Sequence, residues 1–158
     1  MKSTSDILDA LNGVLTTELT SINHYFLHAR MFRNWGFENL DKVAYKKSIK
    51  DMKQADELIE RILMLEGLPN LQRLSPLKVG EQPKEMITLD ETFQHEQIDQ
   101  LKSAIALCEE KKDFVSRGIL SEILEYEEDY LDFVETQLHQ IDAIGIENYL
   151  QSQLEEDE

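Results

Sequence analysis

The chain has 158 residues, of which 41% are hydrophobic and 30% charged, a composition typical of one soluble globular domain. Its 32 acidic residues outnumber the 16 basic ones and give a formal net charge of −16, which argues against nucleic acid and anionic membranes as partners. The single cysteine excludes a disulfide framework and a cysteine-based metal cluster. No apolar stretch approaches the roughly 20 residues of a membrane span, and the N-terminus lacks the apolar core of a secretory signal. We therefore expect a cytoplasmic protein.

The distribution of helix breakers predicts long helices. All three prolines fall between positions 69 and 83, and elsewhere apolar residues recur every three or four positions. We expect one domain, with helices at approximately 5–35, 40–66, 83–111, 113–144 and 146–154. Residues 67–82 have no helical period and are too long for a simple turn, so they are expected to cross the length of a bundle. A short acidic tail follows the last helix.

Four long helices with one long crossover are the arrangement of ferritin-like bundles. We therefore expect an all-α, ferritin-like four-helix bundle with one long crossover loop and a short C-terminal fifth helix. Four stretches make the resemblance specific, because they closely resemble bacterioferritins over essentially the whole chain: INHYFLHARMFRNWGFENL (22–40), IERILMLEGLPNLQ (59–72), DFVSRGILSEILEYEEDYLDFVETQL (113–138) and GIENYLQSQL (145–154). The resemblance implies a cytoplasmic shell of twenty-four subunits that stores iron as a ferric mineral.

The resemblance also implies haem b between two-fold-related subunits, with one methionine from each as axial ligand. That methionine matches Met52, and a thioether is a known ligand of haem iron. The expected haem pocket also contains Leu19, Asn23, Phe26, Tyr45 and Ile49. Helical spacing places the pocket residues of each helix along one stripe, and a two-fold axis supplies a second copy of both. The alternative is that Met52 only fills a gap in an interface.

The family carries a di-iron ferroxidase centre built from one Glu on each of two helices and a Glu-x-x-His motif on each of the other two. The corresponding six positions in this sequence are Glu18, Asp51, Gln54, Gln94, Glu127 and Tyr130. Only Glu18 and Glu127 are intact, and Asp51 is one methylene shorter than the expected glutamate.

The other three positions have lost their charge or their imidazole. Gln54 and Tyr130 stand where the two histidines belong, and Gln94 replaces a bridging carboxylate with an amide. The chain contains no Glu-x-x-His motif at all. We therefore expect no intact catalytic residue, and a subunit that oxidises Fe²⁺ very slowly or not at all. A single loosely held cation at the remaining oxygen ligands is the alternative.

Carboxylates in a bundle core need partners if no metal satisfies them. Lys47 lies one turn before Asp51, so its ammonium could reach the pocket. Gln54, Gln94 and Tyr130 could donate hydrogen bonds to the two retained glutamates. These side chains would form a hydrogen-bonded plug in place of the metal. Alternatively, Lys47 points into the shell cavity and water fills the site.

Several other polar residues invite interpretation. His24 and His28 are spaced i, i+4 and could bind a divalent metal together, but we expect a polar pair on the surface. His95 and His139 are isolated and expected to be solvated. We expect Cys108 to be a semi-buried hydrophobic residue rather than a reactive thiol.

The lysines beside Lys47 also bear on iron. The resemblance implies that Lys46 and Lys50 line the shell cavity, where they would repel Fe²⁺ rather than collect it, although an ordinary solvated helix face is the alternative. It also implies that a bacterioferritin-associated [2Fe–2S] ferredoxin docks near the haem, at positions matching Leu68, Pro69, Leu77, Glu81 and Glu85.

Together these features predict a haem-binding iron-storage subunit that lacks a complete ferroxidase centre and co-assembles with a ferroxidase-competent subunit. A homomeric bacterioferritin with slow residual oxidation of Fe²⁺ by O₂ is the main alternative. A DNA-protecting mini-ferritin is disfavoured by the net charge and the fifth helix. A scaffold without metal is disfavoured by Met52 and its neighbours.

Overall fold

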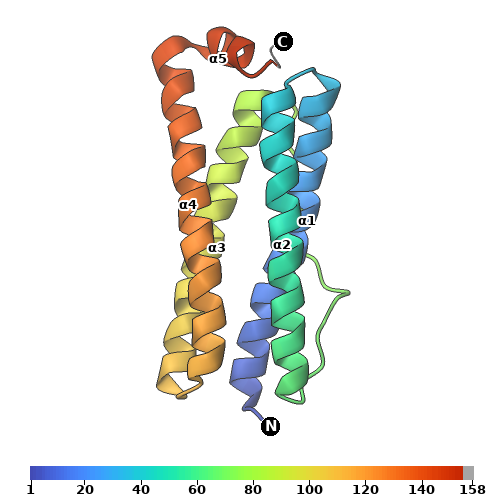
Figure 1. Ribbon diagram of the computed structural model, residues 1–158, viewed down its shortest axis with the longest axis vertical. Helices are drawn as coiled ribbons and strands as arrows, with labels where there is room; N and C mark the ends of the chain where they lie inside the picture. Colours follow the sequence, from blue (N-terminus) through green and yellow to red (C-terminus); the bar gives the residue numbers. More distant parts are fainter. Residues whose placement is uncertain (155–158) are drawn as a thin grey trace.

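The computed structural model describes residues 1–154, so the acidic tail expected at 155–158 lies outside the described residues. The described chain forms five helices: α1 (Ser5–Asn34), α2 (Glu38–Met64), α3 (Pro83–Glu110), α4 (Phe114–Ile144) and α5 (Ile146–Ser152). The four long helices run along the long axis of the molecule, and α5 lies across one end (Figure 1). α1 pairs with α2 and α3 pairs with α4. The all-α four-helix bundle expected from the sequence is confirmed.

Positive φ angles occur at the ends of all four long helices, including Lys112 after α3 with φ of 60°. Gly36 follows the end of α1 with φ of 85°, in the left-handed region that favours glycine. After α2 the left-handed residue is Glu66, with φ of 61°, whereas Gly67 is needed for space, because a Cβ there would lie 2.6 Å from the Leu8 side chain. Gly145 joins α4 to α5 with φ of 82° and ψ of 154°, a conformation open essentially only to glycine.

The crossover between α2 and α3 runs along the outside of the bundle, as Figure 1 shows, and is anchored on α1. Asn12 donates to the carbonyl of Leu68 at 3.2 Å and accepts from the backbone of Asn70 at 2.9 Å. Further along, the backbone of Ser75 donates to the Thr20 hydroxyl at 3.0 Å. These bonds hold a segment without secondary structure against one helix.

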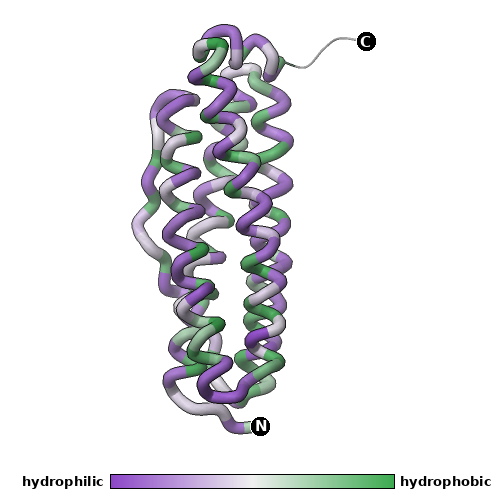
Figure 2. The backbone as a smooth tube through the Cα atoms, turned by 90° about the vertical axis from the view of Figure 1, so that its left-hand side faces the viewer, coloured by the Kyte–Doolittle hydropathy of each residue, from purple (hydrophilic) through white to green (hydrophobic). Residues whose placement is uncertain are grey.

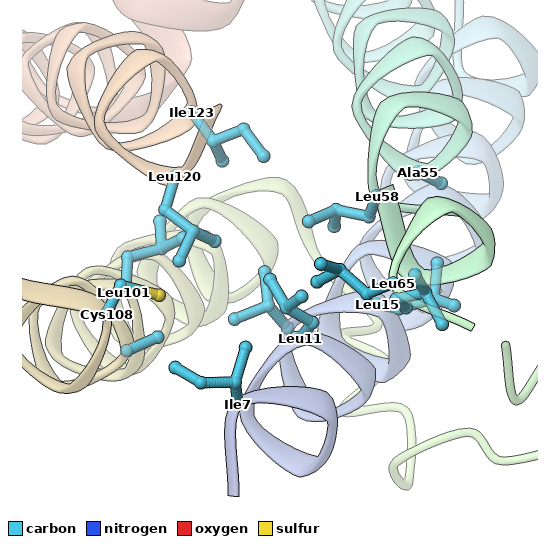
Figure 3. Close-up of a cluster of buried hydrophobic side chains, with 13 residues drawn as sticks. Ile7, Leu11, Leu15, Ala55, Leu58, Leu65, Leu101, Cys108, Leu120 and Ile123 are labelled. Carbon is cyan, nitrogen blue, oxygen red and sulfur yellow. The ribbon is translucent and has the colours of Figure 1, made fainter. Parts of the chain in front are cut away.

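Hydrophobic and hydrophilic residues alternate along each long helix (Figure 2). The hydrophobic ones face the inside of the bundle and form two apolar clusters. The cluster in Figure 3 draws side chains from all four long helices, including Ile7, Leu11, Leu15, Leu58, Leu101, Cys108, Leu120 and Ile123. The second includes Ala29, Phe32, Leu40, Met86, Val134, Ile141 and Tyr149. The helical positions between these clusters carry buried polar side chains instead.

α5 closes the end of the bundle next to the second cluster. Tyr149 is fully buried, and its hydroxyl donates to the side chain of Gln137 on α4 at 2.7 Å. The backbone of Asn39 at the start of α2 donates to the carbonyl of Gln153 at 3.1 Å. Among the described residues, no helix combines the length and apolar character that crossing a bilayer requires.

Candidate functional site

The polar layer between the two apolar clusters contains the six positions singled out in the sequence. Glu18 comes from α1, Asp51 from α2 and Glu127 from α4, and all three are fully buried. One carboxylate oxygen from each lies within 4.8 Å of the others. Three carboxyl groups this close in a bundle core require a cation, protons or hydrogen-bond donors to offset their charge.

The Lys47 side chain supplies the cation. It is fully buried, and its ammonium forms ion pairs with Asp51 and, at 3.0 Å, with Glu127. The same ammonium lies 4.9 Å from the ring centre of Tyr25 and 5.5 Å from that of Tyr126, within the range of cation–π attraction. Of the two orientations that the sequence left open for Lys47, the structure therefore has the one inside the bundle.

Amide groups complete the network around the carboxylates. With its nitrogen turned toward the carboxylates, Gln54 donates to Glu18 and Glu127 at 3.0 Å each. Gln94 donates to Glu127 at 2.7 Å and accepts from the Tyr25 hydroxyl at 2.8 Å. The amide donors that the sequence predicted at these two positions are thus present.

Sequence reasoning missed two further donors. Ser21 donates its hydroxyl hydrogen to Asp51, and Gln97 donates to Glu18 at 2.7 Å. Both were accessible from helical spacing, because Ser21 lies three residues after Glu18 and Gln97 lies three residues after Gln94. Each shares a helix face with a position already identified.

Tyr130 contributes differently from what the sequence predicted. Among the described hydrogen bonds, its hydroxyl donates to neither Glu18 nor Glu127. Its ring instead lies 5.1 Å from the Lys47 ammonium and meets the Tyr25 ring edge to face at 5.2 Å. Tyr130 therefore contributes the face of its ring to the Lys47 ammonium rather than a hydrogen bond to the glutamates.

The electrostatics of the layer follow from burial. Burial, reinforced by Asp51 and Glu127, raises the pKa of Glu18 well above its ordinary value. Burial also raises the pKa of Asp51 to about 7, although Lys47 opposes the shift. Burial alone would lower the pKa of Lys47, but the three carboxylates reverse this and raise it. One ammonium and protons held on carboxyl groups can therefore balance this cluster without a metal ion.

A second feature lies on the outer face of α1 and α2. The Met52 side chain is 54% exposed. It lines a groove of about 730 Å³ together with Leu19, Ile22, Asn23, Ala55, Ile59, Leu71 and Leu74. Phe26 and Tyr45 lie further along the same helices with their ring centres 6.5 Å apart.

Comparison with known proteins places these features in a family. The sequence pattern described as Ferritin-like domain matches residues 8–144. A protein called Bacterioferritin from Mycobacterium avium is 42% identical over 149 residues, which cover 94% of each chain. Bacterioferritin BfrA from Mycobacterium tuberculosis is 41% identical with the same coverage, and Bacterioferritin from Brucella melitensis is 38% identical over 94% of this chain and 92% of its own.

This chain belongs to the bacterioferritin family. Membership places it among the iron-storage proteins and confirms the ferritin-like class of its bundle. A bacterioferritin in which Lys47 enters the carboxylate layer has a central site unlike the expected Glu and Glu-x-x-His set.

The expected haem residues of this bacterioferritin share the face that carries the groove, but they do not all line it. Leu19, Asn23 and Met52 line the groove, and Ile49 is only partly exposed. Phe26 and Tyr45 are exposed and sandwich Arg30, whose guanidinium lies 5.0 and 5.2 Å from their ring centres. A soft sulfur ligand in an apolar groove with aromatic neighbours suits a flat macrocycle with a central iron.

The expectation of a solvated pair at His24 and His28 was wrong. Both imidazoles are buried, because α3 covers this face of α1 and brings Asp90 between them. Asp90 lies 2.6 Å from His24 Nε2 and 3.0 Å from His28 Nδ1. Periodicity along α1 alone carries no information on which neighbouring helix covers this face.

The remaining sequence expectations have mixed outcomes. His95 and His139 are exposed, as expected, with His95 3.7 Å from Glu135. Cys108 is fully rather than partly buried, and burial raises the pKa of its thiol to about 11, so it is not a reactive thiolate. Lys46 and Lys50 are exposed, and Lys50 lies 5.3 Å from the Tyr126 ring centre.

Proposed function

We propose that this chain is the haem-binding subunit of a cytoplasmic, twenty-four-subunit bacterioferritin shell, and that its own central site does not oxidise Fe²⁺. The observation that carries the proposal is the position of the Lys47 ammonium, 3.0 Å from Glu127 and paired with Asp51. Two of the oxygen ligands that iron would need already bind a cation.

The ligand set argues in the same direction. A di-iron centre of this class uses four carboxylates and two imidazoles, and this layer has three carboxylates and no imidazole. An incoming Fe²⁺ would have to displace the ammonium, whose pKa is raised by these carboxylates and which therefore keeps its charge. It would also have to break the hydrogen bonds that the side-chain amides of Gln54 and Gln94 donate to the carboxylates.

If this subunit does not oxidise iron, a shell built with it needs another source of Fe³⁺. We propose that a second bacterioferritin subunit with the complete Glu and Glu-x-x-His set supplies the ferroxidase activity, and that the two co-assemble. Native mass spectrometry of shells purified from the source cells should then show two subunit masses. A single mass would contradict the co-assembly.

The haem would be held by Met52 from each of two subunits across a two-fold axis. Haem b would supply a route for electrons into the stored mineral, and Leu19, Asn23 and the nearby aromatic rings would orient the macrocycle. A [2Fe–2S] ferredoxin would deliver those electrons by docking near the crossover, where Leu68 is 84% exposed and Leu77 42%.

A single-turnover assay tests the missing ferroxidase activity. Fe²⁺ is mixed at two ions per chain with the homomeric protein in air, and ferric species are followed by stopped-flow absorbance. We expect only the slow rate of uncatalysed oxidation. The second candidate, a homomeric bacterioferritin with slow residual activity, is favoured by the proximity of Glu18, Asp51 and Glu127. It predicts a rate above that of the buffer and proportional to protein concentration.

A further inference from the structure

A second buried cluster of potential metal ligands lies where α1 packs against α3. His24 and His28 lie one turn apart on α1, and both face Asp90 on α3. The side chains of His24 and His28 are 2% and 1% exposed, and that of Asp90 is 9% exposed. One ligand atom from each lies within 4.8 Å of the others. The function proposed above uses none of the three.

We propose that His24, His28 and Asp90 form a binding site for a divalent transition-metal ion, such as Zn²⁺ or Fe²⁺. Two imidazole nitrogens and one carboxylate oxygen favour these borderline ions over Mg²⁺ and Ca²⁺, which prefer oxygen ligands. Three protein ligands also leave at least one coordination position open. The proposal is independent of whether the central layer oxidises iron.

Binding an ion requires the Asp90 side chain to move. Metal bonds of about 2.0–2.2 Å in a tetrahedral arrangement separate neighbouring ligand atoms by roughly 3.3 Å. The Asp90 oxygen lies 2.6 Å from His24 Nε2 and 3.0 Å from His28 Nδ1, so it occupies the space in front of both nitrogens. We expect rotation of the Asp90 side chain to move this oxygen aside, so that the ion lies between it and the two nitrogens.

Hydrogens must also be rearranged on binding. Burial alone would raise the pKa of Asp90, but the hydrogen bonds from both histidines lower it overall, so its carboxylate is an acceptor. The ring nitrogens facing it therefore carry hydrogens. A metal ion would take their place, and each neutral imidazole would keep one hydrogen on its opposite nitrogen. That nitrogen in His28, Nε2, is buried and has no hydrogen-bond partner among the described residues.

A cavity gives the cluster an entrance. About 280 Å³ in volume, it reaches His24 and has walls from α1, α3 and the crossover, including Thr20, Ser75 and Lys78. Gln97 also lines it, and the carbonyl oxygen of this buried amide lacks a hydrogen-bond partner among the described residues.

Anomalous diffraction from crystals of the whole protein soaked in Zn²⁺ tests the site directly. Data collected above and below the zinc absorption edge distinguish zinc from any haem or mineral iron. We expect a zinc peak bonded to His24, His28 and Asp90. Peaks elsewhere on a zinc-saturated molecule, with none here, would overturn the proposal and leave these side chains as a structural hydrogen-bond network.

Equilibrium dialysis against Zn²⁺ provides the matched solution test. His24→Gln should lower zinc affinity at this site at least tenfold, reducing the tightly bound zinc by about one ion per chain. His95→Gln is the control, because His95 is exposed and belongs to a different candidate group with Glu91 and Glu135. Equal zinc binding by the wild type and His24→Gln would overturn the proposal. If His24→Gln fails to assemble, His28→Gln and the wild-type crystal decide the question.

Discussion

Replacing Lys47 by methionine is the sharpest perturbation of the central layer. Methionine keeps the length and apolar character of the lysine stem and removes only the charge. Asp51 and Glu127 would lose their buried cation, and breaking such a pair typically costs about 3–5 kcal/mol. Lys50→Met is the matched control, because Lys50 is exposed on the same helix and an exposed charge contributes less than about 1 kcal/mol.

The sign of the pH dependence follows from the same charges. Removing Lys47 leaves one more uncompensated negative charge in the layer, which the folded protein can offset only by holding a further proton on a carboxyl group. That proton is bound more easily at low pH. The loss of stability in Lys47→Met should therefore be several kcal/mol at pH 7 and smaller at pH 5.

Guanidinium unfolding followed by helical circular dichroism at pH 5, 7 and 8 measures this effect. The expected result is a large, pH-dependent loss of unfolding free energy for Lys47→Met and almost none for Lys50→Met. Equal stability of the two variants at pH 7 would refute the reasoning, since it would mean that the Lys47 ammonium contributes no more than an exposed charge.

Three other predictions follow from the same contacts. Met52→Leu should abolish haem binding while the shell still assembles, as judged by the haem spectrum and by gel filtration, and full haem occupancy would disprove the ligand assignment. The expected ligands can be restored with Asp51→Glu, Gln54→His, Gln94→Glu and Tyr130→His. This variant should show a rapid phase of Fe²⁺ oxidation only when Lys47→Met is added, because the Lys47 ammonium otherwise binds the carboxylates. A rapid phase with Lys47 retained would show that the ammonium does not block the site. The pKa values of Glu18 and Asp51 are raised in the folded protein, so it holds protons that the unfolded chain releases. The free energy of unfolding should therefore fall as the pH rises from 5 to 8. Glu18→Gln should make this fall with pH less steep, and an unchanged pH dependence would exclude Glu18 as its source.

The bundle was predictable because helical periodicity and the position of breakers depend on local physics. All three prolines lie in or next to the crossover, and Gly36 marked a turn that needs positive φ. The end of α2 was less predictable, because Glu66 adopts the left-handed conformation while Gly67 is fixed by its close approach to Leu8. That approach depends on tertiary packing.

The candidate sites likewise have a part that the sequence predicts and a part that depends on tertiary packing. Positions on one helix, such as Lys47 and Asp51, are related by helical spacing, so the sequence alone predicts that Lys47 can reach the carboxylates. The direction in which the Lys47 ammonium points, and the partner of His24 and His28, depend on neighbouring helices. Asp90 carries no motif that would pair it with two histidines more than sixty residues earlier.

The occupancy of the carboxylate layer under iron is the most direct test of the central claim. Crystals of the unmodified protein would be soaked anaerobically in Fe²⁺, and anomalous data collected at the iron absorption edge. We predict no iron between Glu18 and Glu127, with the Lys47 ammonium still about 3 Å from Glu127. Two iron peaks there, with Lys47 displaced from the layer, would contradict it.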